Sequence, residues 1–324
     1  MVDEAQLEST ACLLCNQSDA QLLMPTRDRL CGLPGEFQLV RCDHCGLVYL
    51  NPRPTPGTIG VYYPDDYESY ISKRSERMSR LARLSLRYGL WKRCRLVCRH
   101  KQSGHLLDVG CATGQFLAEM RHYSGWQVSG VEPNGHAAEF ARQAFGLKVY
   151  QEDLVSAALP SSGFDAITLW DVFEHLHQPR AILAEVRRIL KPDGILVLRV
   201  PSLDSWDARV FGPYWAGLDS PRHLTVFSKS TLARMLSQAG FRVLERRTGS
   251  GSYFALLLSL RLWLDERVTS PAWRKRFLRL VSNPIARAAL TPPLFASDAL
   301  GLGAEMVVVA RPVGSTGSDQ VENS

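Results

Sequence analysis

Residues 106–117 read LLDVGCATGQFL, a short apolar run that turns through small residues directly into a helical pattern. Small residues in such a turn let a ligand approach the backbone closely. Gly110, Ala112 and Gly114 stand two residues apart, whereas the dinucleotide-binding fingerprint is Gly-x-Gly-x-x-Gly. This spacing disfavours NAD. Glu132 ends the next expected strand, where an acidic side chain can accept hydrogen bonds from ribose hydroxyls.

Apolar runs alternate with helical patterns after this turn, which is typical of βαβ units and a parallel sheet. We therefore expect an α/β fold over residues 102–312, with a doubly wound, Rossmann-like sheet. The expected seven strands lie at 105–109, 127–131, 147–150, 164–170, 195–200, 242–247 and 305–310. Residues 251–303, rich in Leu, Trp and Arg, are expected to form a helical insertion, and residues 313–324 a disordered tail.

The composition predicts a cytoplasmic protein. The chain has 324 residues, 45% of them hydrophobic, and its start lacks the basic and apolar regions of a signal peptide. The longest apolar run, 253–264, contains Arg261 and is shorter than the ~20 residues of a membrane-spanning helix. All eight cysteines lie before residue 112, and closely spaced pairs in a cytosolic protein indicate a metal site rather than disulfides.

Four of these cysteines form two Cys-x-x-Cys pairs, Cys12 with Cys15 and Cys42 with Cys45. Two pairs at this spacing supply four thiolates to a tetrahedral ion, so residues 1–53 are expected to form a small zinc-ribbon-like domain. The zinc should be structural, because the four cysteines fill its coordination sphere. The alternatives are free thiols in a reducing compartment or a redox pair, which is disfavoured because neither motif opens a helix after a strand.

Residues 54–101 are expected to form a proline-rich linker followed by a helix at 75–99 that is interrupted at Gly89. Between residues 73 and 101 the single acidic residue is Glu76, and the basic residues are Lys73, Arg74, Arg77, Arg80, Arg83, Arg87, Lys92, Arg93, Arg95, Arg99 and Lys101. One interpretation is peripheral contact with an anionic membrane at its inner face, with 253–264 resting on the same surface. The other is a helix packed on the catalytic domain. Nucleic acid is not expected as a partner, because no recognition motif accompanies the charge.

The order of motifs from 106 to 240 resembles the class I S-adenosylmethionine-dependent methyltransferases. Their first motif is an acidic residue followed by Gly-x-Gly-x-Gly, and here only the middle glycine differs, as Ala112. Residues 164–176, FDAITLWDVFEHL, are similar to the fourth-strand motif of the branch that contains ubiquinone-pathway enzymes, and residues 190–194, LKPDG, match the turn before strand five.

The resemblance implies the roles of the cofactor-binding residues. Asp108 and the backbone of Gly110, Ala112 and Gly114 would hold the methionine part of S-adenosylmethionine. Glu132 would hold the ribose and Asp153 the adenine N6. Asp171 and Glu174 are candidate contacts for the cofactor's amino group or the acceptor, and their alternative role is a helix cap.

The cysteine module before this fold resembles that of sugar C-methyltransferases, although their carboxy-terminal extension is absent here. The expected reaction is methyl transfer to an oxygen or carbon nucleophile of a small molecule, with a sugar or lipid-linked glycan intermediate as the acceptor class. The alternatives are an NAD-dependent dehydrogenase or epimerase-like enzyme, and a non-catalytic zinc adaptor that binds the cofactor.

A general base is expected where the acceptor loses a proton. His223 is the leading candidate, because its segment follows strand five, where acceptor-binding loops gather in this fold, and because the pKa of histidine suits proton transfer. His175 lies just past strand four, near the expected cofactor edge, and is a second candidate together with Asp171. The alternative for both histidines is a structural role in their loops.

Overall fold

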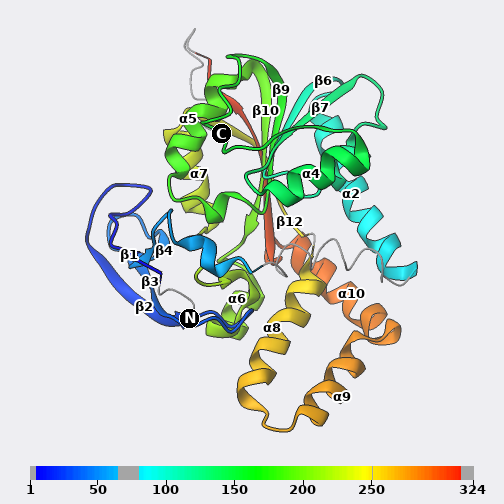
Figure 1. Ribbon diagram of the computed structural model, residues 1–324. Helices are drawn as coiled ribbons and strands as arrows, with labels where there is room; N and C mark the ends of the chain where they lie inside the picture. Colours follow the sequence, from blue (N-terminus) through cyan, green and yellow to red (C-terminus); the bar gives the residue numbers. More distant parts are fainter. Residues whose placement is uncertain (1–4, 65–79, 250, 315–324) are drawn as a thin grey trace, which may run out of the picture.

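The computed structural model describes residues 5–64, 80–249 and 251–314 (Figure 1). A seven-stranded sheet in the order β12-β13-β10-β9-β6-β7-β8 forms its centre. All pairs from β10 to β8 are parallel, and β13 is antiparallel to both β10 and β12. The strands are β6 (Gly104–Val109), β7 (Trp126–Val131), β8 (Lys148–Tyr150), β9 (Phe164–Trp170), β10 (Leu190–Pro201), β12 (Phe241–Thr248) and β13 (Glu305–Pro312). The predicted Rossmann-like fold is confirmed.

Helices cover both faces of this sheet, as Figure 1 shows. Leu107 and Ile167 pack into the core beneath α5 and α7, whereas their neighbours Leu106 and Ala166 pack into the core beneath α2, α3 and α4. This alternation follows from the two-residue period of side chains along a strand. The helices are α2 (Arg80–His100), α3 (Gln115–Met120), α4 (Gly135–Phe145), α5 (Pro179–Ile189) and α7 (Lys229–Gln238).

The amino-terminal module is a small antiparallel sheet in the order β11-β4-β3-β2. Three of its strands, β2 (Ala20–Arg27), β3 (Glu36–Cys42) and β4 (Val48–Leu50), come from the module itself. The fourth, β11 (Thr225–Val226), comes from the segment after β10. The α/β domain thus completes the sheet of the amino-terminal module two residues after His223.

Apolar packing also connects the amino-terminal module to the α/β domain. Leu39 and Val48 of the small sheet share one core with Trp215, Leu218 and Leu224 of the segment between β10 and β11. The segment between the module and α2 contains β5 (Arg53–Pro54), paired with β1 (Leu7–Glu8), and one 3₁₀ turn, η1 (Ile59–Tyr62). The segment between β10 and β11, which shares the apolar core with the small sheet, contains α6 (Trp206–Phe211), η3 (Gly212–Tyr214) and η4 (Ala216–Leu218).

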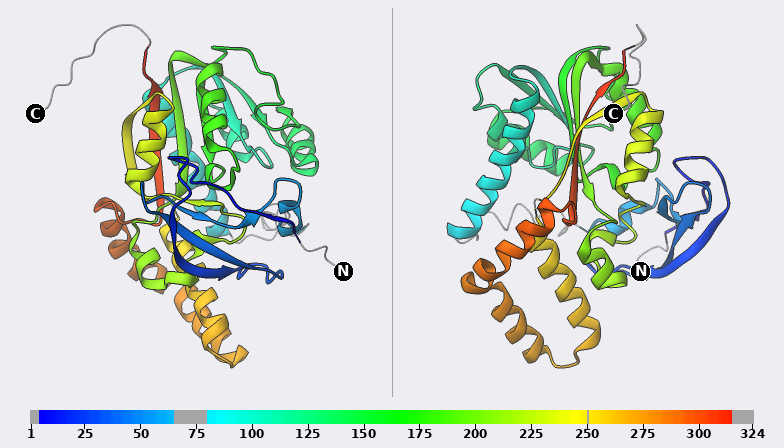
Figure 2. Two further views of the ribbon diagram at one scale, coloured as in Figure 1. Left: turned by 90° about the vertical axis from the view of Figure 1, so that its left-hand side faces the viewer. Right: turned by 180° about the vertical axis from the view of Figure 1, so that it is seen from behind.

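Three helices fill the insertion between β12 and β13: α8 (Ser252–Arg267), α9 (Pro271–Ser282) and α10 (Pro284–Ala299). They project beyond the sheet (Figure 2). Residues 253–264, which we expected on a membrane-facing surface, lie in α8, where Ala255, Leu262 and Leu264 are buried. α8 therefore attaches the insertion to α6, η3 and η4, and α9 and α10 are the exposed helices.

Two details of the predicted secondary structure are wrong. α2 continues through Gly89 without a break, because one glycine inside a helix costs only about 1 kcal/mol and the buried Cys94 and Val97 hold the second half in place. Residues 190–194 belong to β10, with a shift of register between Leu190 and Ile195, rather than forming a separate turn. Residues 75–79 and 315–324 lie outside the described residues. No described helix is long and apolar enough to cross a bilayer.

Candidate active site and metal centre

The turn from β6 to α3 requires its glycines. Gly110 and Gly114 have φ values of 70° and 76°, in the left-handed region that favours glycine. A Cβ atom on Gly110 would lie 2.6 Å from Cγ2 of Val172, and one on Gly114 would lie 2.6 Å from Cδ1 of Leu147. Ala112 between them also has a positive φ, 46°. The backbone of this turn therefore lies directly against Val172, which follows β9, and Leu147, which precedes β8.

Glu132 connects this turn to the end of β7. Its Oε2 accepts a hydrogen bond from the backbone N–H of Ala112 at 2.8 Å, and its Oε1 accepts one from Asn134 at 2.9 Å. Burial raises the pKa of Glu132, although the two backbone donors oppose this shift. Each carboxylate oxygen can accept a second hydrogen bond, so the geometry fits the two hydroxyls of a ribose.

Asp108 lies beneath the glycine turn and is buried. Thr168 on β9 donates a hydrogen bond from its hydroxyl to Oδ1 of Asp108 at 2.5 Å. Burial raises the pKa of Asp108 to about 7, and the hydroxyl and Arg93 only partly offset the effect. Its contact with the methionine part of the cofactor stays a prediction.

Asp153 is exposed and caps a local turn. Its Oδ1 accepts hydrogen bonds from the backbone N–H groups of Val155 and Ser156 at 2.8 and 2.9 Å, and its Oδ2 accepts one from the Ser156 hydroxyl at 2.6 Å. The hydrogen bonds from Ser156 lower the pKa of Asp153, so this residue is a carboxylate. The adenine contact stays a prediction.

Asp171 pairs with an arginine that the sequence analysis missed. Nε of Arg199, on the neighbouring strand β10, lies 2.6 Å from Oδ1 of Asp171, and Nη2 of Arg199 contacts Oδ2. Burial, reinforced by the charge of Arg93, lowers the pKa of Arg199 to about 9. The guanidinium of Arg199 thus fixes the orientation of the Asp171 carboxylate, and the contact of Asp171 with the cofactor or the acceptor stays a prediction.

The two candidate histidines meet at the end of β9. His175 closes η2 (Phe173–His175), and its ring lies edge-on to the ring of His223 with 4.6 Å between the centroids. Nδ1 of His223 lies 2.9 Å from the carbonyl oxygen of Gly217 and must donate to it, since a carbonyl only accepts. In neutral His223 the lone pair is therefore on Nε2, which lies 4.0 Å from Oε1 of Glu174.

Glu174, the other candidate contact for the cofactor's amino group or the acceptor, lies next to these histidines and is fully buried. Its side chain is 1% exposed, and neither carboxyl oxygen has a hydrogen-bond partner among the described residues. Burial raises the pKa of Glu174 well above its usual range, and burial together with His223 lowers the pKa of His175 to about 3. One ligand atom from each of Glu174, His175 and His223 lies within 4.8 Å of the others, so this donor set can also hold a metal ion.

A buried ion cluster positions the loop that carries His223. The guanidinium of Arg222 donates to Asp28 at 3.0 and 2.7 Å, to Asp219 at 2.6 to 3.1 Å and to the carbonyl of Tyr62 at 2.9 Å. The side chains of Arg222 and Asp28 are both 0% exposed. Asp28 directly follows β2 of the amino-terminal module, so this module fixes the residue before the candidate base.

The linker also reaches the site. The hydroxyl of Tyr63 and the carbonyl of Arg222 each lie 3.0 Å from Nδ1 of His175. His177 donates from Nε2 to the carbonyl of Pro54 at 2.9 Å and thereby holds the linker rather than the acceptor site. No local pattern distinguishes Tyr63 in the sequence, because its contact depends on chain folding over more than a hundred residues.

The four predicted zinc ligands form one cluster. Sγ of Cys12 lies 3.4 Å from Sγ of Cys45, and Sγ of Cys15 lies 3.5 Å from Sγ of Cys42. These distances are far from a disulfide bond of ~2.05 Å and close to the ~3.8 Å edge of a tetrahedron with Zn–S bonds of ~2.3 Å. Burial raises the pKa of the Cys42 thiol, but hydrogen bonds from backbone N–H groups lower it. The resulting pKa is about 7. The residues fit a tetrahedral zinc ion.

Comparison with known proteins defines the class. Residues 74–246, more than half of the chain, match the family described as "Methyltransferase domain", and the chain belongs to this family. Its motifs and fold are those of a class I S-adenosylmethionine-dependent methyltransferase, and the alternative dehydrogenase is not favoured.

Among its relatives is O-methyltransferase cnsE of Penicillium expansum, which is 28% identical over 153 residues, or 44% of this chain and 54% of that protein. Ubiquinone biosynthesis O-methyltransferase of Haemophilus ducreyi is 28% identical over 177 residues, or 51% of this chain and 74% of that protein. The match thus spans about half of the length of the first relative. A Haloferax volcanii methyltransferase solved with the Trm112 activator shares the fold, with a TM-score of 0.50 and 14% identity over 78% of this chain and 97% of that one.

Proposed function

We propose that the chain transfers the methyl group of S-adenosylmethionine to an oxygen or carbon nucleophile of a small molecule. One observation carries the proposal. The glycine turn at 110–114, Glu132 and the pair of Glu174 and His223 all lie at the carboxyl edge of the parallel strands, where doubly wound sheets bind their ligands. Val172, which touches Gly110, is two residues from Glu174. A cofactor on the turn would therefore direct its methyl group toward the histidines.

The cofactor supplies a methyl group that its sulfonium already activates, so the protein mainly has to align the acceptor. Such alignment is worth up to about 7 to 11 kcal/mol. His223 would accept the acceptor's proton on Nε2. The bound cofactor would supply the methyl group, with its methyl–sulfur bond breaking to leave S-adenosylhomocysteine as the acceptor's oxygen or carbon forms the new bond. The carbonyl of Gly217 holds the required tautomer through Nδ1. Glu174, whose pKa is raised by burial, faces the same nitrogen.

The proposed acceptor is a sugar or lipid-linked glycan intermediate, and the proposed role of the four cysteines is to hold a structural zinc. The amino-terminal cysteine module supports a sugar as the acceptor, because it resembles the cysteine module of sugar C-methyltransferases. Zinc at Cys12, Cys15, Cys42 and Cys45 would stabilise the small sheet. Through Asp28, this sheet also fixes Arg222 beside the proposed base.

Calorimetry with S-adenosylmethionine, S-adenosylhomocysteine and NAD tests the cofactor assignment. The proposal predicts heat with the first two ligands and none with NAD. Glu132→Gln should weaken S-adenosylmethionine binding, because the amide presents a donor to one ribose hydroxyl, whereas Glu152→Gln, an exposed control in the next loop, should not. Binding of NAD without binding of S-adenosylmethionine would overturn the assignment. Cofactor binding without methyl transfer to any sugar acceptor would favour the zinc adaptor.

A further inference from the structure

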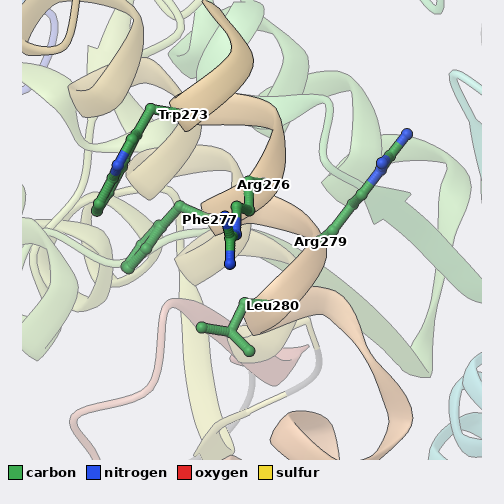
Figure 3. A pocket seen from close by; sticks show the side chains of 5 residues that line it. All are labelled: Trp273, Arg276, Phe277, Arg279 and Leu280. Atoms are coloured by element: carbon green, nitrogen blue, oxygen red, sulfur yellow. The ribbon is translucent and has the colours of Figure 1, made fainter. Parts of the chain in front are cut away.

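α9 exposes an apolar stripe on its surface. Trp273, Phe277 and Leu280 recur at spacings of four and three and point to the same side of the helix (Figure 3). The rings of Trp273 and Phe277 are stacked, with 5.9 Å between centroids and 13° between planes. Trp273 is 59% exposed and Leu280 63% exposed. Together with Arg276 and Arg279 these three residues line an open hollow of about 660 Å³.

The charge of α9 is entirely basic. Its charged residues are Arg274, Lys275, Arg276 and Arg279. Arg274 forms an ion pair with Asp265 of α8 at 3.1 Å. Lys275, Arg276 and Arg279 form no ion pair among the described residues, and all three are exposed. Figure 3 shows Arg276 beside the apolar stripe and Arg279 farther from it around the helix.

The same composition continues on neighbouring helices. α10 exposes Ile285 and Phe295, at 82% and 73%. Arg287 of α10 donates a hydrogen bond to the hydroxyl of Ser85 on α2 at 2.7 Å, so the insertion touches the basic helix. The adjoining turn of α2 exposes Leu84 at 60%. We call α9, α10 and this part of α2 the α9–α10 surface.

We propose that the α9–α10 surface binds an anionic phospholipid bilayer. Aromatic and aliphatic side chains next to Arg and Lys are the composition that lies in a bilayer interface, and each basic residue is attracted to anionic headgroups. Trp273 and Leu280 enter the interface, and Lys275, Arg276 and Arg279 contact the headgroups. A second copy of the chain fits this surface less well, because two copies of the basic α9 would repel each other. The inference is independent of the proposed methyl transfer.

Sedimentation with vesicles tests this proposal with the full chain. Vesicles of phosphatidylcholine with phosphatidylglycerol should bind the protein, whereas vesicles of phosphatidylcholine alone should bind it much less. The triple variant Lys275→Gln/Arg276→Gln/Arg279→Gln should lower the partition coefficient about 100-fold, since each basic residue near the surface contributes about fivefold. High salt should also lower the partition coefficient of the wild type, because it screens the attraction between the basic residues and the headgroups.

A matched triple variant provides the control. Its three exposed arginines lie on α5, α7 and β12, away from the insertion: Arg180→Gln, Arg234→Gln and Arg242→Gln. This variant has the same net charge as the first one and should bind vesicles like the wild type. Circular dichroism checks that both variants are folded.

Replacing the apolar stripe tests its contribution separately. Trp273→Ser/Leu280→Ser should also lose vesicle binding, and Val155→Ser, an exposed apolar control near Asp153, should not. Failure of the wild type to bind anionic vesicles would overturn the proposal. Equal loss of binding in the α9 triple variant and in the control triple variant would also overturn it. A wild-type dimer that Trp273→Ser/Leu280→Ser converts to a monomer, without vesicle binding, would assign the surface to a second copy instead.

Discussion

Arg222→Met tests the connection between the amino-terminal module and the loop that carries His223. The substitution leaves the carboxylates of Asp28 and Asp219 buried without the guanidinium that now pairs with both, and their side chains are 0% and 8% exposed. Removal of one partner from a buried ion pair costs about 3 to 5 kcal/mol, because an uncompensated charge stays buried. We expect the free energy of unfolding to fall by this amount.

Calorimetric melting of the wild type, of Arg222→Met and of a surface control measures this effect. At about 1.5 °C per kcal/mol for a chain of 324 residues, the melting temperature of Arg222→Met should fall by about 4 to 8 °C. The control is Arg27→Met, because Arg27 is 58% exposed and pairs with Glu266 at the surface, where an ion pair is worth about 0 to 1 kcal/mol.

A double-mutant cycle with Asp28→Asn shows whether the effect belongs to the ion pair. The free energies of the single variants should fail to add by about 0.5 to 3 kcal/mol, as is typical of residues in contact. The reasoning is refuted if Arg222→Met melts like Arg27→Met, or if the effects of Arg222→Met and Asp28→Asn are additive.

Three further predictions follow from the other parts of the site. Elemental analysis should find one equivalent of zinc in the wild type and in Cys31→Ser, at an exposed cysteine outside the cluster, and none in Cys12→Ser. Zinc retained in Cys12→Ser would remove this assignment. His223→Ala should lower methyl transfer by ~100-fold or more with unchanged cofactor affinity, whereas a normal rate would return His223 to a structural role. The pKa of Asp108 is raised to about 7 in the folded state, so the folded state binds more protons than the unfolded chain between about pH 4 and pH 7 and loses stability as the pH rises through this window. Denaturant titration measures the free energy of unfolding of Asp108→Asn minus that of the wild type, and this difference should increase from about pH 4 to about pH 7. A difference that does not change with pH would contradict the raised pKa of Asp108.

The central sheet was predictable because its strands carry strong local patterns. Residues 164–170, for example, are all buried in the structure, and their apolar sequence already indicates a strand covered on both faces. The glycine turn and the cysteine pairs were equally local signals, because backbone conformation and ligand spacing depend on neighbouring residues. The fold and the two clusters therefore followed from short stretches of sequence.

The contacts that assemble the active site were not predictable, because they join distant segments. β11 has only two residues, too few for a periodic pattern, and its partner β4 lies far away in the sequence. Arg222 and Asp28 are 194 residues apart. The burial of Glu174 likewise depends on packing that no neighbouring residue reveals. The break expected at Gly89 failed for the same reason, since tertiary packing outweighs the helix propensity of one residue.

The most direct test of the central claim is methyl transfer itself. The full chain is incubated with S-adenosylmethionine carrying an isotopically labelled methyl group and with a panel of nucleotide-linked and lipid-linked sugars, and mass spectrometry follows the label. The account predicts label on an oxygen or carbon of one acceptor, with the signal lost in His223→Ala and in Glu132→Gln. A labelled product whose yield is the same in these variants as in the wild type would contradict the site described for residues 110–114, Glu132 and His223.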